Sequence, residues 1–327
     1  MVWDLIADIG GTNMRLAAVI DGEIAHRITH ETSGALAVTE GLSALCRHMA
    51  TSPRRVWVAA AGVVRGGYVQ LTNGGQGFSE RDLLQATGAE TARIMNDFEA
   101  AAWSLVSPGQ ADLLVLQGDA PEPEGRTPRL IVGPGTGLGV GSLVWRGDCP
   151  VVVPGEGGHV RIAPRHAQDI PLFETLGNLW PETRMAQGQE GHLALEAEAI
   201  ISGTGIPVLM RALCQLHGRE EEVWDAAAVF EAARLQSDPL ASEAVELLCT
   251  FLGAVAGDLA LVVNARGGVF LCGGVLAGNA WIFDRPTFLD AFNQGGRHTV
   301  FRKTLPIYLY RDAKFGLNGV LNAMSHQ

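Results

Sequence analysis

The sequence predicts an α/β protein of two lobes, and three features indicate this. The chain has 327 residues, 47% of them hydrophobic, which is enough for roughly two domains of about 150 residues, each with its own core. Residues 5–20 and 130–145 share one layout although they lie far apart. Helix-like apolar segments lie between and after them. We therefore expect an internally duplicated α/β chain with two hairpin-bearing halves.

The two similar segments each predict a strand, a tight turn and a second strand. They read LIADIGGTNMRLAAVI and LIVGPGTGLGVGSLVW, so an aliphatic run enters a turn rich in Gly and Thr and leaves as another strand-like run. Neither the GxxxxGK[ST] loop nor a GxGxxG turn that feeds a helix is present. Backbone amides of such turns can still form an anion-binding concavity, which makes both hairpins candidate phosphate sites.

Other elements follow from local patterns. TARIMNDFEAAAWSLV predicts a strand that ends near Asn96 and a helix that begins near Asp97. VWVAAAGVV is typical of a buried strand, and residues 243–265 carry apolar side chains at helical spacing. GGVFLCGGVLAGN predicts a strand that ends in a glycine turn. Residues 165–189 show little periodicity and are expected to form a surface excursion.

Composition excludes several classes of partner and location. The chain carries 24 basic and 35 acidic residues, with a net charge of −11 and no run of Lys and Arg, which argues against nucleic acid or an anionic membrane. Asp4 and Asp8 interrupt the first apolar stretch, which lacks a basic region, so neither a secretory signal nor a transit peptide is indicated. Residues 267–283 are uncharged but rich in glycine turns rather than typical of a membrane span. We expect a cytoplasmic protein with small-molecule substrates.

The five cysteines predict reduced thiols rather than disulfides or a zinc site. Their number is odd and no CxxC pair occurs. Each is interpreted as a small buried apolar residue. They are Cys46, Cys149, Cys214, Cys249 and Cys272.

Six blocks in order carry a family resemblance that spans Asp8 to Gly319: ADIGGTNMRLA, MNDFEAA, GPGTGLG, PGEGGHV, EAIISGTGI and GGVFLCGGVL. Together they resemble the bacterial glucokinase family, within the actin-like sugar kinase and heat-shock ATPase superfamily. The resemblance implies a two-lobed actin-like ATPase (ribonuclease H-like) fold with a central cleft. We expect a small α/β lobe of residues 1–108, completed by a C-terminal helix at about 313–327, and a large α/β lobe of residues 109–312.

The implied activity is the first step of glycolysis, phosphorylation of D-glucose at O6 by ATP to give glucose 6-phosphate and ADP. ATP and Mg2+ are the implied cofactors, and a homodimer is the implied assembly. Asp8 would reach Mg2+ through water, since this hard cation prefers carboxylate, water and phosphate oxygens. The implied nucleotide-binding residues are Ala7, Asp8, Ile9, Gly10, Gly11, Thr12, Thr136, Gly137, Gly273 and Gly274.

Each of these glycine turns has a simpler interpretation. Asp8 could cap an ordinary β-turn, and the glycines at 137 and 273–274 could serve tight packing or a strand end. Arg15 could neutralise phosphate charge or be a solvated strand residue, and it is left outside the expected site.

Asn96 and Asp97 form the expected reaction centre. Phosphoryl transfer to a sugar hydroxyl needs a carboxylate that orients the hydroxyl and accepts its proton, and the resemblance gives this role to Asp97. Asn96 would bind a neighbouring hydroxyl. From the residues alone, Asp97 is more typical of a helix N-cap.

Glu156, His159 and Glu198 complete the sugar-binding set by resemblance. Glu, His and Asn side chains can satisfy the many hydroxyls of a pyranose and select among sugars. A surface Glu, a structural His and a solvated helix face are the alternatives. Glu198 is chosen by its spacing to the SGTG stretch, and Glu196 remains open in its place.

The exact substrate also remains open at this point. Residues 72–79 lack the aromatic residue that the related pattern carries near Gln76, and the excursion at 165–189 is enlarged. A kinase for fructose, mannose or an amino sugar, or a non-catalytic sugar sensor, would fit the same blocks. ATP is the default donor, with ADP and polyphosphate as alternatives. The cysteine-rich zinc motif of ROK-type sugar kinases is absent.

Overall fold

The computed structural model describes residues 2–10, 13–31, 38–72, 77–109, 112–122, 125–186, 192–220, 222–311 and 314–327. It divides into two compact units. The first comprises Met1–Pro108, Leu143–Pro154 and Lys314–Gln327, and the second comprises Gly109–Ser142 and Gly155–Ala313. The expected large lobe included residues 143–154, which group here with the first unit because Val152 packs against its core.

A mixed five-stranded sheet forms the centre of the first unit, in the order β3-β2-β1-β4-β8. Its strands are β1 (Asp4–Ile9), β2 (Asn13–Ile20), β3 (Glu23–Glu31), β4 (Arg55–Ala60) and β8 (Thr91–Asn96). β1 and β2 are antiparallel, so the predicted first hairpin is confirmed. β1, β4 and β8 run parallel, which brings their carboxyl ends to one edge of the sheet.

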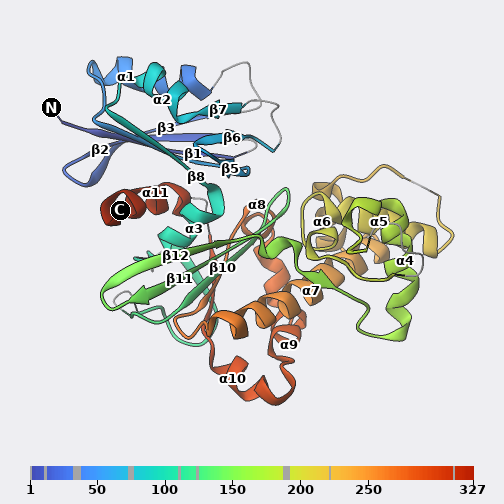
Figure 1. Cartoon of the computed structure of the whole chain (residues 1–327). Helices are drawn as coiled ribbons and strands as arrows, with labels where there is room; N and C mark the ends of the chain where they lie inside the picture. Colours follow the sequence, from blue (N-terminus) through green and yellow to red (C-terminus); the bar gives the residue numbers. More distant parts are fainter. Residues whose placement is uncertain are drawn as a thin grey trace. The chain divides into compact units, whose positions relative to one another are not determined.

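Helices cover both faces of this sheet (Figure 1). On one face lie α1 (Val38–Met49) and α2 (Glu80–Thr87), and on the other α3 (Asp97–Ser104) and α11 (Phe315–His326). Side chains alternate along β1. Leu5, Ala7 and Ile9 therefore join the core on the side of α1 and α2, while Ile6 joins the core on the side of α3 and α11. The small strands β5 (Val64–Arg65), β6 (Tyr68–Gln70) and β7 (Gly77–Ser79) form a separate three-stranded sheet.

The second sheet has six strands in the order β12-β11-β10-β15-β16-β9. They are β9 (Leu113–Gln117), β10 (Arg129–Pro134), β11 (Leu138–Arg146), β12 (Cys149–Gly155), β15 (Val269–Leu271) and β16 (Ile307–Tyr310). β10 and β11 are neighbours, which confirms the second predicted hairpin. A two-stranded sheet pairs β13 (Arg161–Ile162) with β14 (Leu195–Glu196).

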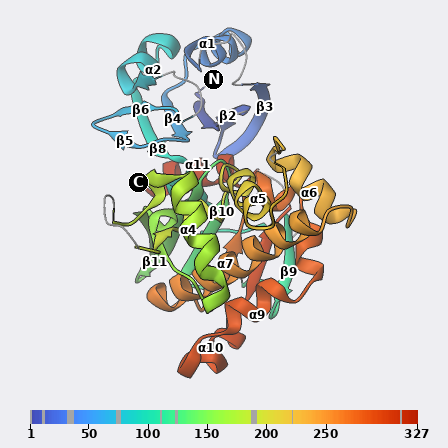
Figure 2. The same cartoon turned by 90° about the vertical axis from the view of Figure 1, so that its right-hand side faces the viewer.

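Helices account for most of the remaining second unit, and α5 packs against both α4 and α7 (Figure 2). They are α4 (Ile170–Leu179), α5 (Gly205–Leu216), α6 (Ala226–Arg234), α7 (Pro239–Val263), α8 (Gly274–Ala277), α9 (Thr287–Asn293) and α10 (Thr299–Thr304). Short 3₁₀ turns at Gly157–His159, Ala167–Asp169, Pro181–Thr183, Ala197–Ala199, Ala280–Asp284 and Gly296–His298 connect the elements.

Helix α7 is long and apolar enough to cross a membrane by length and composition, with a mean hydropathy of 1.9 over its most apolar window. Its side chains nevertheless form the centre of the large core, where Leu248, Leu252 and Ala256 are fully buried. A core helix of a globular protein meets the same criteria, so packing accounts for the apolar character of α7.

Two expectations from the sequence are wrong. Residues 165–189 were expected to be a surface excursion, but they contain α4, which buries Leu172, Phe173 and Leu176 in the core; residues 187–189 lie outside the described range. The spacing of these side chains gives α4 an apolar face. Cys149 is exposed at the start of β12 and Cys46 is partly buried, while Cys214, Cys249 and Cys272 are buried as expected.

Candidate active site

The carboxyl ends of the parallel strands in the first unit bring the expected reaction centre together. Ile9 on β1 lies in register with Ala60 on β4, which lies in register with Asn96 on β8. Asp8, one residue before the end of β1, therefore lies near the same sheet edge at which Asp97 begins α3. This edge is where parallel α/β sheets present ligand-binding groups.

Asn96, not Asp97, caps helix α3. The Asn96 Oδ1 accepts hydrogen bonds from the amides of Phe98 at 2.8 Å and Glu99 at 3.3 Å, and its Nδ2 donates to the carbonyl of Gly62 at 3.0 Å. An Asn at this position satisfies the unpaired amides of the first turn. The helix-cap interpretation of Asp97 is therefore wrong, because Asn96 is the N-cap of α3.

Asp97 is held at the first position of α3 with one carboxylate oxygen engaged. Its Oδ1 accepts a hydrogen bond from the Phe98 amide at 3.0 Å. Burial raises the pKa of Asp97 to about 7, the negative charge of Asp8 adds to this, and nearby hydrogen bonds partly oppose it. A carboxylate whose pKa lies near neutrality is suited to accept and release protons.

Asp8 lies in a confined space between a cation and a glycine. Its Oδ2 is 3.2 Å from Arg15 Nη1, and its side chain is 13% exposed. Burial raises the pKa of Asp8, and Arg15 opposes that rise. A Cβ added at Gly316 on α11 would lie 2.4 Å from Asp8 Oδ2, so glycine leaves room for this carboxylate.

The rest of the first predicted phosphate turn is only partly described. The Gly10 amide donates to the Asn13 carbonyl at 2.9 Å, which closes the hairpin. Gly11 and Thr12 lie outside the described residues. The side chains of Ala7 and Ile9 are 0% exposed and belong to the core, so they offer a nucleotide no side-chain contact.

In the second unit, several blocks of the sequence meet at the turn between β10 and β11. The carbonyls of Gly135 and Thr136 accept hydrogen bonds from the amides of Gly203, at 2.8 Å, and Thr204, at 3.2 Å. Gly273, with φ of +97°, would place an added Cβ 2.4 Å from the Pro134 carbonyl, whereas Gly274 faces open space. The predicted Thr136, Gly137, Gly273 and Gly274 are therefore brought to one place.

Glu198 is bound to this same turn. Its Oε2 accepts a hydrogen bond from the Leu138 amide at 2.9 Å. A Cβ added at Gly137 would lie 2.4 Å from that oxygen, so the turn admits the carboxylate only because residue 137 is glycine. Glu198 thus connects the segment before α5 with the hairpin of β10 and β11.

His159 pairs with Glu196 rather than with Glu198. Nδ1 of His159 is 2.8 Å from Glu196 Oε2. The pKa of His159 is raised, first by this hydrogen bond and also by the charges of Glu198 and Glu156, while burial opposes the rise. Glu156, at the start of the 3₁₀ turn that ends at His159, is exposed. Sequence reasoning noted Glu196 only as an alternative to Glu198, since spacing could not reveal its partner.

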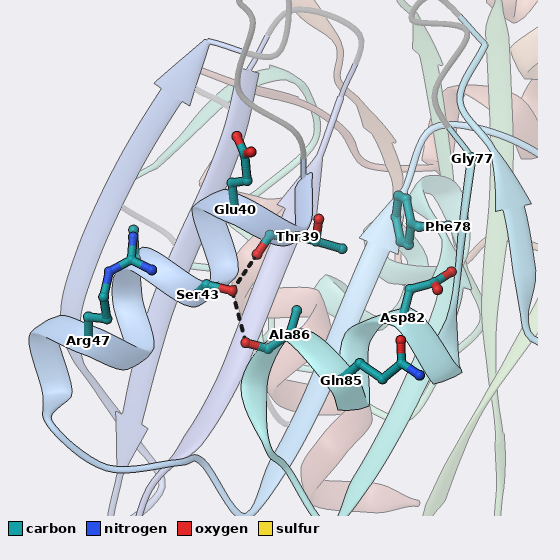
Figure 3. A pocket seen from close by; sticks show the side chains of 10 residues that line it. Thr39, Glu40, Ser43, Arg47, Gly77, Phe78, Asp82, Gln85 and Ala86 are labelled. Atoms are coloured by element: carbon teal, nitrogen blue, oxygen red, sulfur yellow. Dashed lines mark hydrogen bonds between the residues drawn. The ribbon is translucent and has the colours of Figure 1, made fainter.

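A surface pocket of about 850 Å³ lies elsewhere in the first unit (Figure 3). It lies between α1 and α2, and the Ser43 hydroxyl donates across it to the carbonyl of Ala86 at 2.9 Å. Its lining residues are Thr39, Glu40, Ser43, Ala44, Arg47, Gly77, Phe78, Asp82, Gln85 and Ala86. None of the residues expected to carry chemistry lines it.

Comparison with known proteins agrees with the arrangement of these blocks. The glucokinase family model matches residues 5–327. A glucokinase of Sinorhizobium fredii is 36% identical over 319 residues, which cover 97% of this chain and 90% of that protein.

Solved structures share the fold. The crystal structure of a glucokinase from an Antarctic psychrotroph matches with a TM-score of 0.83 and 26% identity, over 100% of both chains. A ROK family glucokinase from Streptomyces griseus, in complex with glucose and AMPPNP, matches with a TM-score of 0.59 and 20% identity, over 98% of each chain. The α/β fold expected of actin-like sugar kinases is confirmed. By the span of the family model and the identity to its relatives, the chain belongs to the glucokinase family.

Proposed function

We propose that this protein phosphorylates D-glucose at O6 with ATP, giving glucose 6-phosphate and ADP. Membership of the glucokinase family supports the reaction. The observation that supports the site best is the cap of α3. Because the Asn96 side chain forms this cap, the carboxylate of Asp97 is not needed for it and can act on the substrate. Asp97 would orient the sugar hydroxyl and accept its proton as the phosphoryl group is transferred.

The second unit would supply the sugar and phosphate contacts. Glu156, His159 and Glu198 carry the polar groups for the pyranose hydroxyls. The turn around Thr136 and Gly137 would lie next to phosphate oxygens, with its Gly135 and Leu138 amides held by Gly137 and Glu198. Asn96 would bind a neighbouring hydroxyl. Its side chain also holds Gly62 and the first turn of α3, and its hydrogen bond to Asp97 opposes the rise that burial causes in the pKa of that carboxyl. A solved ROK family glucokinase holds glucose with AMPPNP, an ATP analogue, which supports ATP as donor.

In the first unit, Mg2+ would bind mainly to the nucleotide and not to a complete set of protein ligands. No cluster of three or more His, Cys, Asp or Glu suited to a metal occurs within the part of the chain that the structure describes. Asp8 offers a single hard carboxylate, already paired with Arg15, so water and phosphate oxygens would complete the shell. Bound Mg2+ would neutralise phosphate charge during transfer.

The wider setting follows from the same assignment. We place the protein in the cytoplasm, at the first step of glycolysis, and as a homodimer, on the basis of family resemblance. Light scattering coupled to size-exclusion chromatography measures the assembly directly, and a mass of one chain would reject the homodimer.

A coupled ADP-release assay with a panel of hexoses tests the proposed reaction. Glucose should give the highest kcat/KM among glucose, mannose, fructose and glucosamine, and the product should be the 6-phosphate. Higher kcat/KM with another sugar would reassign the substrate. Glucose binding without ADP release would instead make the protein a sugar sensor.

A further inference from the structure

Two acidic residues on one short segment of the second unit serve different partners. Glu198 Oε2 accepts from the Leu138 amide at 2.9 Å, in the phosphate turn. Glu196 Oε2 lies 2.8 Å from Nδ1 of His159, in the sugar-binding block. The carboxylate nearest to the imidazole is therefore not the one that binds the turn.

Backbone pairing holds Glu196 and His159 together. Strands β13 and β14 are antiparallel, with Arg161 opposite Glu196 and Ile162 opposite Leu195. The Ala197 amide donates to the Val160 carbonyl at 2.8 Å, which extends this pairing by one more bond. The contact thus depends on a fixed register rather than on two free surface side chains.

The contact fixes which imidazole nitrogen faces outward. With a carboxylate at Nδ1, that nitrogen carries its hydrogen in both the neutral and the charged ring. Within the described residues Nε2 has no hydrogen-bond partner, and the side chain is 50% exposed. Nε2 is therefore available to a ligand, as an acceptor in the neutral ring and as a donor in the charged ring.

The charged groups that shift the pKa of His159 are acidic, while Arg161 lies opposite Glu196 in the strand pair. Glu156 precedes it in the same turn, Glu196 faces it from β14, and Glu198 faces it from the adjoining 3₁₀ turn. Glu196 has the largest influence on its pKa, through the direct hydrogen bond. Removing this one carboxylate should lower the pKa of His159 while the other two remain.

We propose that Glu196 is a positioning residue for the sugar: by accepting the Nδ1 hydrogen of His159, it holds the ring so that Nε2 meets a hydroxyl of the bound hexose. This inference rests on the proposed function, since it assigns His159 to the hexose. Glu196 acts through His159 and touches no reacting atom. Its loss should therefore weaken sugar binding and leave the transfer step intact.

The first experiment compares Glu196→Ala and Glu196→Gln with wild type. Glucose KM, and glucose Kd by calorimetry without nucleotide, should rise about three- to tenfold in Glu196→Ala, the scale of one partly exposed hydrogen bond to a charged group. kcat should stay within about twofold of wild type. Glu196→Gln keeps an acceptor oxygen and should lose less affinity. Glu174→Gln, an exposed carboxylate on α4, is the matched control.

A double-mutant cycle separates positioning from direct contact. In a His159→Gln background, Glu196→Gln should have no further effect on glucose Kd, because its partner is already gone. An equal loss of affinity in both backgrounds would make Glu196 an independent sugar ligand and overturn the proposal. A fall in kcat without a rise in KM would overturn it as well.

The histidine titration tests the pair without any substrate. In NMR spectra of the free protein, the signal absent from His159→Gln should titrate at lower pH in Glu196→Gln than in wild type. An unchanged midpoint would overturn the pairing. If the midpoint shifts but wild type binds no hexose, the pair exists and the proposed function is what fails, and the sugar-positioning role fails with it.

Discussion

The two units handle the acidic groups of the proposed site in opposite ways. In the first unit, burial and then the nearby charge of Asp8 raise the pKa of Asp97, and Arg15 pairs with Asp8. In the second unit, Glu196 and Glu198 each accept a hydrogen bond from a defined donor. Buried carboxylates without full compensation are costly, whereas paired ones near the surface are not. The contrast is consistent with the proposed roles, in which the first unit carries proton transfer and the second carries recognition.

Replacing the proposed base should break the first unit's role most severely. Asp97→Asn keeps the size of the side chain and its place in α3 but removes the proton acceptor. We expect kcat to fall by about 10² to 10⁴-fold with glucose Kd little changed. Glu99→Gln, two residues along the same helix, is the control and should remain close to wild type. Near-normal turnover in Asp97→Asn would remove Asp97 from the mechanism.

The pH profile should separate the two units next. The pKa of Asp97 is about 7, so the ionised base is lost as the pH falls through that value. kcat/KM for glucose should therefore decrease about tenfold per pH unit below neutrality and level off above it. The residual activity of Asp97→Asn should not show this decrease of kcat/KM below neutrality. A flat wild-type profile from pH 8 to 5.5 would contradict the assignment.

Glycine substitutions in the turn between β10 and β11 test the proposed ligand-binding role of the second unit. Gly137→Ala would place a Cβ 2.4 Å from Glu198 Oε2, so the carboxylate must leave the Leu138 amide. We expect KM to rise about tenfold for glucose and for ATP, the scale of a lost hydrogen bond to a charged group. Gly135→Ala meets nothing within 4 Å in the same turn and should have a clearly smaller effect. Steady-state kinetics on both variants make the comparison, and equal effects would reject the steric argument.

The smallest expected effect is on stability, and it runs opposite to the effect on activity. A carboxyl whose pKa is raised in the folded protein destabilises it once ionised, with no cost below its unfolded pKa and the full cost above its folded pKa of about 7. Asp97→Asn should therefore be more stable than wild type at pH 8. We expect a gain of about 1 to 2 kcal/mol, because Asp97 is only partly buried and solvent reduces the cost of its charge. The gain should shrink toward pH 5. Thermal melts at the two pH values measure it, and a gain that grows on acidification would contradict it.

Local sequence patterns were enough for the hairpins, the long helix and the boundary at Asn96. Alternating glycines in a β-branched run predict a hairpin, and apolar residues at helical spacing predict α7, because both signals depend on near neighbours in the chain. The sequence pattern did not predict α4. Its apolar face is recognised only in the structure, where these side chains pack into the core.

The sequence by itself determined the family and the chemical character of the site, since blocks such as DIGGTN, NDFEAA and GEGGH specify residue types in a fixed order. It left open whether Asp97 caps a helix, and it did not predict which carboxylate pairs with His159. Those questions concern hydrogen-bond partners, most of them far apart in the chain, and only tertiary structure decided them. Asn96 is the cap of α3, Glu196 pairs with His159 through the register of β13 and β14, and Glu198 binds the turn between β10 and β11.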